Sequence, residues 1–150
     1  MELNDAITIP AGREAVWKAL NDVDVLRQCI PGCEELTQDS PTDMAAKVTL
    51  KVGPIKAKFA GEVTLSDINA PEGYVLSGEG KGGVAGFAKG SATVRLEEVS
   101  ANETILHYDA KADVGGKIAQ LGARLLNSTA KKLAKKFFDD FNTVVTESVT

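Results

Sequence analysis

The fold class is decided by a stretch of ten residues, KAKFAGEVTL at 56–65. The side chains at 57, 59, 61, 63 and 65 are small or apolar, whereas those at 56, 58, 62 and 64 are charged or hydroxylated. Successive side chains of a β-strand point to opposite faces of the sheet. A period of two therefore predicts a strand with one apolar face and one solvated face.

The same alternation returns in three other stretches and predicts an antiparallel sheet. Apolar residues occupy every second position at 48–52, 92–96 and 106–114, and polar or charged residues lie between them. Turn-forming clusters at 53–54, 69–73 and 100–103 separate these stretches as hairpin loops would. A meander of about six or seven antiparallel strands fits this spacing.

Helical periodicity appears at both ends of the chain. After Gly115-Gly116 an apolar stripe with a spacing of 3.6 continues to about Val145, which predicts a helix roughly 45 Å long. Two shorter helices, at 11–20 and 24–29, follow a first strand at 2–9. The stripe of the long helix consists of Ile118, Gly122, Leu125, Leu126, Thr129, Leu133, Phe137 and Val144.

A sheet with one apolar face and a helix with one apolar stripe must cover each other. We therefore predict an α+β fold, as a single domain over residues 1–150, in which a curved antiparallel sheet wraps around the long C-terminal helix. Hydrophobic residues make up 43% of the chain, but aromatic residues only 5%. Small and aliphatic side chains must fill much of the core, which leaves room for a cavity.

The net charge, the N-terminal sequence and the cysteine content limit the classes of function that the protein can have. The net charge of −4 and the isoelectric point near 5.1 argue against a nucleic-acid partner. The chain does not open with a basic segment followed by an apolar run, and no 18 apolar residues occur in succession. We therefore expect a cytoplasmic protein without a membrane span. Two cysteines, Cys29 and Cys33, form no disulfide framework, which agrees with a reduced compartment.

Side chains suited to catalysis or metal binding are scarce. The single histidine, His107, falls on the solvated face of its strand, where a solvent-exposed residue is more expected than a general base. Cys29 and Cys33 lack the further ligands of a zinc site and are expected as small apolar residues near a turn. Residues 78–83 match G-x-G-x-x-G, but a strand follows them where a dinucleotide site needs a helix. We predict no nucleotide site, no metal site and no enzymatic activity.

Several motifs together resemble one known family. The sequence has IPGCE at 30–34 after two short helices, KVGPIK at 51–56 followed by FAG at 59–61, and glycine-rich stretches at 78–83 and 86–90. In this order they resemble the G subunit of carbon monoxide dehydrogenase, in the START-like superfamily with the helix-grip fold, over essentially the whole chain. The resemblance implies an internal apolar cavity. It also implies an accessory protein that serves a molybdenum-containing dehydrogenase and helps recruit it to the membrane.

The leading hypothesis is a non-catalytic protein that binds an apolar small molecule. Given the resemblance, a respiratory quinone is the attractive ligand, a lipid is the other candidate, and no built-in cofactor is expected. Tyr108 and Thr129 are candidates for orienting a polar head group. The predicted lining residues are Leu50, Phe59, Val63, Leu96 and Tyr108 on the sheet and Leu125, Thr129 and Leu133 on the helix.

Two surfaces are candidates for contact with the dehydrogenase or the membrane. The Pro31-Gly32 turn and Phe87, in the glycine-rich segment 82–90, are candidate docking points, and Phe87 is also a candidate lid over the cavity. Lys131 and Lys135 form a basic stripe with Phe138 on its flank. Helices that lie on anionic lipid show this pattern, and a solvated face is the plainer interpretation. Such a contact would place the protein at the inner face of the membrane.

Two further hypotheses stay open from the sequence. The domain could be an adaptor for dehydrogenase assembly or recruitment, with an interior that packs shut and no physiological ligand. It could also be a cyclase or hydrolase of the same superfamily, although the predicted interior lacks a group of His, Asp or Glu side chains.

Overall fold

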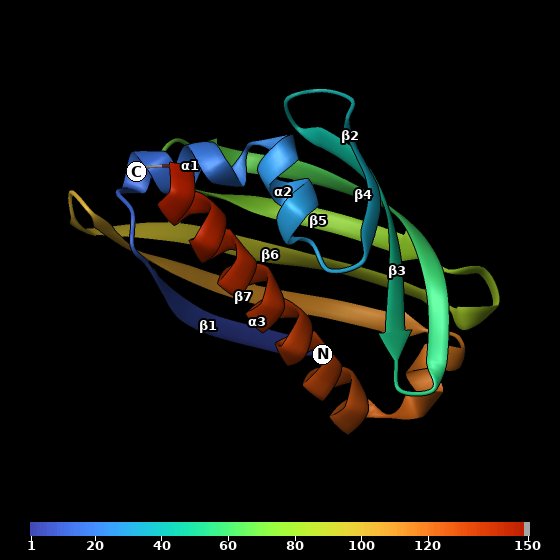
Figure 1. The fold of residues 1–150 in the computed structure, drawn as a ribbon. Helices are drawn as coiled ribbons and strands as arrows, with labels where there is room; N and C mark the ends of the chain where they lie inside the picture. Colours follow the sequence, from blue (N-terminus) through green and yellow to red (C-terminus); the bar gives the residue numbers. More distant parts are fainter. Residues whose placement is uncertain (149–150) are drawn as a thin grey trace.

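A curved antiparallel sheet forms the centre of the computed structural model, which describes residues 1–148 (Figure 1). The strand order is β1-β7-β6-β5-β4-β3-β2, so each strand from β2 to β7 lies beside the next one in the chain. This confirms the predicted meander. The strands are β1 (Glu2–Ile9), β2 (Cys33–Gln38), β3 (Asp43–Val52), β4 (Ile55–Asn69), β5 (Gly73–Lys81), β6 (Phe87–Ser100) and β7 (Glu103–Gly115).

The helices all lie on the concave face of the sheet. The long helix α3 (Ala123–Ser148) crosses this face diagonally, and α1 (Arg13–Leu20) and α2 (Val23–Cys29) lie beside its C-terminal half (Figure 1). Two short 3₁₀ turns, η1 (Gly83–Ala85) and η2 (Lys117–Leu121), connect β5 to β6 and β7 to α3. The predicted α+β helix-grip architecture is therefore confirmed.

The start of the long helix differs from the prediction. Gly116 and Gly122 have φ angles of 83° and 92°, which no right-handed helix can accommodate. The chain between them forms η2, and α3 begins at Ala123. Ile118 therefore belongs to η2 and not to the stripe of α3. With 26 residues, α3 is about 39 Å long.

Local interactions explain where α2 begins and ends. The Asp22 side chain accepts hydrogen bonds from the backbone N–H groups of Asp24 and Val25, which caps the N-terminus of the helix. At the other end Ile30, which precedes Pro31, is extended with ψ at 117°. A residue before proline is driven out of the helical region, so α2 ends there.

The hydrophobic core is divided into two clusters. The larger cluster joins the C-terminal half of α3 to α1 and to the nearer ends of β4–β7, through residues such as Val16, Leu65, Leu106, Phe141 and Val145. The smaller cluster lies at the other end of the sheet and contains Phe59, Ala85 and Ile118, with Val48, Leu50, Ile55, Ala57 and Val114 packed against it. Between them, the concave face is covered less completely.

Phe141 anchors α3 in the larger cluster, since its side chain is fully buried and its ring stacks on that of Phe137. We expect Phe141→Ala to lower the free energy of unfolding by about 3–5 kcal/mol, because it removes a buried ring and leaves a cavity. Urea denaturation followed by circular dichroism measures this change. Phe87→Ala is the matched control: half of this side chain is exposed, so its loss should change stability by only about 0.5 kcal/mol.

Candidate ligand-binding site

An apolar hollow of about 390 Å³ lies on the concave face between the two core clusters. Its floor crosses five strands, from β3 to β7. The directly paired residues Gly61 and Gly80, and likewise Ala92 and Ala110, present small side chains or none. The glycine and alanine residues of the floor are Ala46, Gly61, Gly78, Gly80, Ala88, Gly90, Ala92, Ala110 and Ala112. We call this set the small-residue floor.

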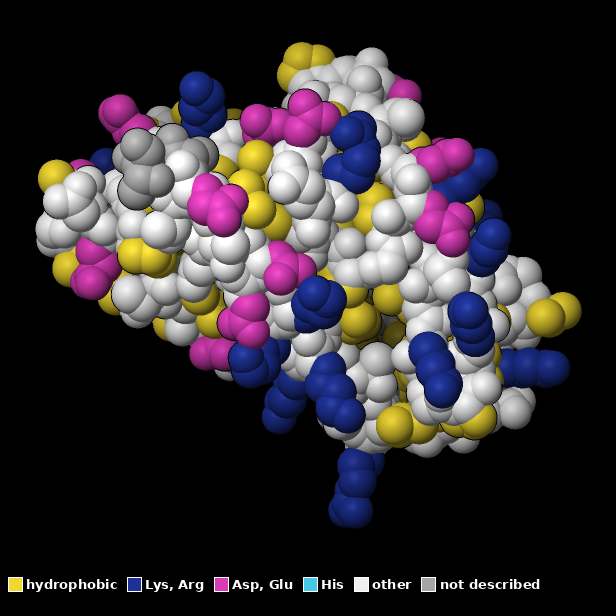
Figure 2. All heavy atoms as spheres, viewed as in Figure 1, with side chains coloured by type: hydrophobic (Ala, Val, Ile, Leu, Met, Phe, Trp, Pro, Cys, Tyr) yellow, Lys and Arg dark blue, Asp and Glu magenta, His cyan; other side chains and the backbone are white. Residues whose placement is uncertain are grey.

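The long helix α3 contributes none of the described residues that line the hollow. On the N-terminal half of α3, Leu126, Thr129 and Leu133 stay half-buried, whereas Phe141 and Val145 further along are fully buried. Figure 2 shows hydrophobic side chains at the bottom of an opening between α3 and β3. The hollow is therefore open to solvent beside the helix.

Some floor glycines are required by the close approach of neighbouring strands. A Cβ atom on Gly90 would collide with the Lys111 carbonyl oxygen and lie 3.1 Å from the Ala112 Cβ. On Gly80, by contrast, a Cβ would meet nothing closer than 3.9 Å. Close strand packing thus explains Gly90, while the absence of a side chain at Gly80 leaves free space above the sheet.

The floor offers no acid or base for catalysis. Glu62, Glu79, Lys89 and Lys111 lie at its margin but occupy alternate strand positions that face the convex side. His107 also faces the convex side, where its Nε2 lies 2.8 Å from a carboxylate oxygen of Glu97. Among residues 1–148, no three His, Cys, Asp or Glu side chains group into a possible metal site. The side chains that face the hollow are therefore mostly apolar.

The two cysteines lie on α2 and β2, close to the side of the hollow. Burial, reinforced by the Asp140 carboxylate, raises the pKa of the Cys29 thiol from 9.0 to about 11, and Lys136 opposes this only partly. Burial also raises the pKa of the Cys33 thiol. Neutral thiols are poor nucleophiles and poor metal ligands, so both cysteines are suited to packing.

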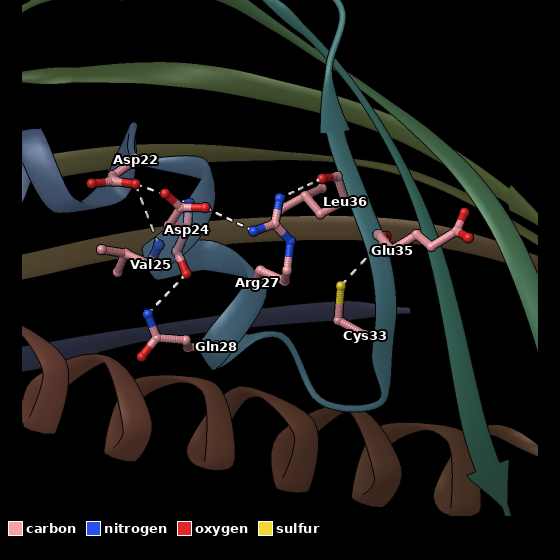
Figure 3. A network of polar contacts seen from close by, with 8 residues as sticks. All are labelled: Asp22, Asp24, Val25, Arg27, Gln28, Cys33, Glu35 and Leu36. Atoms are coloured by element: carbon pink, nitrogen blue, oxygen red, sulfur yellow. Dashed lines mark hydrogen bonds and ion pairs between the residues drawn. The ribbon is translucent and has the colours of Figure 1, made fainter.

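A polar network holds α2 against β2 (Figure 3). The Arg27 guanidinium donates to the Asp24 carboxylate at 2.7 Å and to the Leu36 carbonyl at 3.0 Å. The Gln28 amide donates to the Asp24 carbonyl at 3.0 Å, and the Cys33 thiol lies 3.5 Å from the Glu35 carbonyl. The hydrogen bond from Arg27 to Leu36 joins α2 to β2, whereas the other three contacts lie within one of these two elements.

The predicted ligand-binding residues fall into three places. Phe59 and Val63 line the hollow. Leu50 and Leu96 pack in the smaller and the larger core cluster, respectively, and do not line it. Leu125, Thr129 and Leu133 are half-buried on α3, with Leu125 against Gly53 in the β3–β4 turn. The role of these residues in binding stays a prediction.

A second groove, between β1 and α3, brings together four other predicted residues. Tyr108, Lys131, Lys135 and Phe138 line it with Leu3, Asn4, Asp5, Ile7, Ala134, Asp139 and Asn142. The rings of Tyr108 and Phe138 stack with centroids 5.6 Å apart. Tyr108 is thus placed beneath α3 and not on the small-residue floor, and Phe138 packs on the sheet as well as flanking the lysines.

The predicted contact loops differ in their surroundings. Gly32, with a φ of 71°, accepts a hydrogen bond from the Thr49 backbone, which pins the Pro31-Gly32 turn to β3. Half of the Phe87 side chain is exposed, and its ring lies beside Gly115. The glycine-rich tip is shorter than predicted, because β5 extends to Lys81 and β6 begins at Phe87.

Sequence reasoning missed most of the small-residue floor. Gly78 and Gly80 attracted attention as part of a glycine-rich stretch, yet both lie within β5 and face the hollow. The available signal was the alternation itself, since Gly78, Gly80, Gly90 and Ala92 all occupy inward positions. Small residues at consecutive inward positions of neighbouring strands indicate a gap over the sheet.

This arrangement defines the class of protein: a helix-grip, START-like domain with an apolar hollow on the concave face of its sheet. Residues 6–146 match the family of the carbon monoxide dehydrogenase G subunit (CoxG). The chain belongs to this CoxG family, as its motifs predicted. Family and fold together indicate a ligand-binding accessory protein.

Solved structures share the fold. A conserved protein from Geobacillus kaustophilus is 30% identical, with a TM-score of 0.93 over 99% of this chain and 97% of that one. A START superfamily protein from Mycobacterium smegmatis is 12% identical, with a TM-score of 0.76 over 99% of both chains. The Zhui aromatase/cyclase from Streptomyces sp. R1128 is 14% identical, with a TM-score of 0.69 over 100% of this chain and 96% of that one. The fold therefore occurs in enzymes too, and function must be argued from the site. No curated protein matches the chain.

Filling the hollow should abolish ligand binding without unfolding the protein. Ala110 lies on the floor, so we expect Ala110→Phe to eliminate the fluorescence gain of a neutral apolar dye such as Nile red. Thermal stability should stay the same or rise, because the new ring buries apolar surface. The control is Ala60→Phe, at an exposed position on the convex side of β4, which should leave dye binding unchanged. Equal loss of dye binding in both variants would contradict the assignment of the hollow.

The Cys29 thiol should make stability sensitive to alkaline pH. The folded chain keeps this proton up to about pH 11, whereas the unfolded chain releases it near pH 9.0. Its contribution is complete below pH 9 and is lost as the pH rises toward 11. Urea denaturation at about pH 8 and about pH 10 should show this fall. In Cys29→Ala the fall should be smaller, and an unchanged fall would assign it to other groups.

Proposed function

We propose that this protein is a non-catalytic accessory protein of a molybdenum-containing dehydrogenase of the carbon monoxide type. In this proposal it carries an apolar ligand in the hollow and links the dehydrogenase to the membrane. The observation that supports ligand binding is the small-residue floor, which keeps the middle of the sheet uncovered while both flanking clusters are packed. Membership in the CoxG family supports the dehydrogenase as partner.

Packing energetics favour a ligand over an empty interior. Apolar surface left in water costs about 25 cal/mol per Å². Larger side chains at Ala92 or Ala110 would cover the hollow and remove this cost. A bound ligand removes it as well, with about 0.8 kcal/mol gained for each buried CH₂ group. The hollow of about 390 Å³ also lies within the usual range of small-molecule sites, about 300–1,000 Å³.

A respiratory quinone fits the shape and polarity of this hollow. Its planar head group can lie flat on a floor of glycine and alanine, and its few carbonyl oxygens require few donors. Its tail can leave through the opening beside α3. A quinone also accepts electrons, which gives an accessory protein of a dehydrogenase a reason to hold one. In this proposal, Thr129, which is half-buried on α3, contacts the polar head group of the quinone.

The partner-binding loops belong to the same proposal. The turn at Pro31-Gly32 is hydrogen-bonded to β3, so a dehydrogenase docked there would lie beside a strand that lines the hollow. Delivery of a ligand between a membrane and an enzyme requires such proximity. An adaptor without ligand would not need an uncovered floor, which is why we favour the carrier.

Native mass spectrometry of the protein purified from its own membrane-containing cells tests the proposal. We expect a retained lipophilic mass that is released on denaturation and identified as a quinone. Ala110→Phe should carry no such mass, and Ala60→Phe should retain it. A phospholipid in its place would contradict the choice of quinone. A bare mass under several mild conditions would favour the adaptor, and Ala110→Phe would then leave dehydrogenase capture intact.

A further inference from the structure

The charges of the chain are sorted along the length of the sheet. In a meander, successive turns alternate between the two ends of the strands. The β3–β4 turn, the β5–β6 turn with η1, and the β7–α3 connection with η2 therefore share one end. The β2–β3, β4–β5 and β6–β7 turns share the other end. We call these the basic end and the acidic end.

Each of the three connections at the basic end is flanked by two cations. Each of the three turns at the acidic end is flanked by two carboxylates. The cations are Lys51 and Lys56, Lys81 and Lys89, and Lys117 and Arg124, and the carboxylates are Asp39 and Asp43, Asp67 and Glu72, and Glu98 and Glu103. Figure 2 shows Lys and Arg side chains gathered where Figure 1 places the β3–β4 turn and the start of α3, beside the opening.

Contacts within the fold account for only two of these cations, since Lys81 pairs with Glu79 and Lys89 lies opposite Glu79 and Asp113. Lys51 and Lys56 lie directly opposite each other in the β3–β4 pair, and like charges in this position destabilise a sheet. Within the described part of the chain, neither of them has an ion-pair partner, and neither do Lys117 and Arg124. An external anionic surface would relieve this repulsion.

The basic end also carries the most exposed apolar side chain of the described residues. Val84, on the η1 tip, is 85% exposed, and Phe87 beside it is 50% exposed. The exposed apolar residues of the acidic end, Ile68 and Val99, are 46% and 48% exposed. An apolar tip among lysines is the pattern by which proteins enter a lipid headgroup layer.

We propose that the basic end is the surface by which this protein lands on an anionic lipid bilayer, with Val84 and Phe87 in the headgroup region. None of the described helices is long and apolar enough to cross a membrane. Landing in this orientation places the opening beside α3 close to the lipid. Contact of this surface with lipid does not depend on which ligand the protein carries. Its use in ligand delivery rests on the proposed function.

The kind of cation favours lipid over an acidic protein. Of the six cations that flank the connections at the basic end, five are lysine and one is arginine. Protein interfaces are enriched in arginine and depleted in lysine. Lipid headgroups, by contrast, attract any cation, with about 1 kcal/mol per Lys or Arg near the surface.

The overall negative charge does not prevent this contact. The longest strand, β4, has 15 residues and spans about 50 Å. The Debye length is only about 10 Å at 0.1 M salt. Carboxylates at the acidic end are therefore screened from a bilayer that touches the basic end.

Cosedimentation of the full chain with vesicles tests the proposal. We expect binding to phosphatidylcholine vesicles that contain phosphatidylglycerol and not to pure phosphatidylcholine vesicles. Binding should fall steeply as salt rises from about 0.1 M to about 1 M. The double variant Lys51→Gln/Lys56→Gln should bind roughly thirtyfold more weakly, and Val84→Ser should bind several-fold more weakly. The melting temperature of the double variant should stay the same or rise, because a repulsion is removed.

The acidic end supplies matched controls. Lys18→Gln/Arg95→Gln removes two cations outside the basic end, and Val99→Ser removes an exposed valine side chain at the acidic end. Equal losses in controls and test variants, equal binding to neutral vesicles, or no vesicle binding would each overturn the proposal. The proposal would also be overturned if Lys51→Gln/Lys56→Gln still bound vesicles but no longer captured the dehydrogenase. Dye binding should be unchanged in every variant, because none of the substituted residues lines the hollow. A failure of the membrane-surface proposal can therefore be distinguished from a failure of the proposed ligand binding.

Discussion

One helix has to cover a concave apolar sheet face that is larger than the helix itself. α3 meets this requirement fully only along its C-terminal half, where Phe141 and Val145 are completely buried against β-strands and α1. Towards its N-terminus the apolar side chains of α3 remain half-buried, and none of them lines the floor of glycine and alanine. The separate cluster around Phe59 and Ile118 closes the far end of the sheet without α3. The hollow is the space that these two packed regions leave between them.

The same small residues give the hollow its chemical character. Glycine and alanine add neither polar groups nor bulk, and the acids near the margin face the other side of the sheet. The buried Cys29 thiol is neutral at physiological pH because burial raises its pKa, and His107 is paired with Glu97 on the convex face. The side chains that face the hollow are therefore mostly apolar, as in the usual small-molecule site.

The meander topology connects the binding site to the surface charge. Since alternate turns lie at opposite ends of the sheet, a sequence that places lysines at every second turn acquires one basic and one acidic end. The smaller cluster of Phe59, Ala85 and Ile118 packs beneath the basic end. Burial of Ala85 in this cluster holds the η1 turn that carries the exposed Val84. Ligand binding and surface contact are thus distributed over different residues of one sheet and can be altered separately.

The sequence alone determined the strands, the turns and the long helix, because these depend on the period of neighbouring residues and on local signals such as Asp22 and Pro31. The family followed from motifs that are also local. The sequence placed Phe59 and Val63 at the hollow, but it could not separate them from Leu96, which has the same inward alternation and is buried in the larger cluster. Nor could it show that Tyr108 lies under Phe138. Those assignments depend on where α3 crosses the sheet, and this crossing is set by packing between residues far apart in the chain, which only the tertiary structure decides.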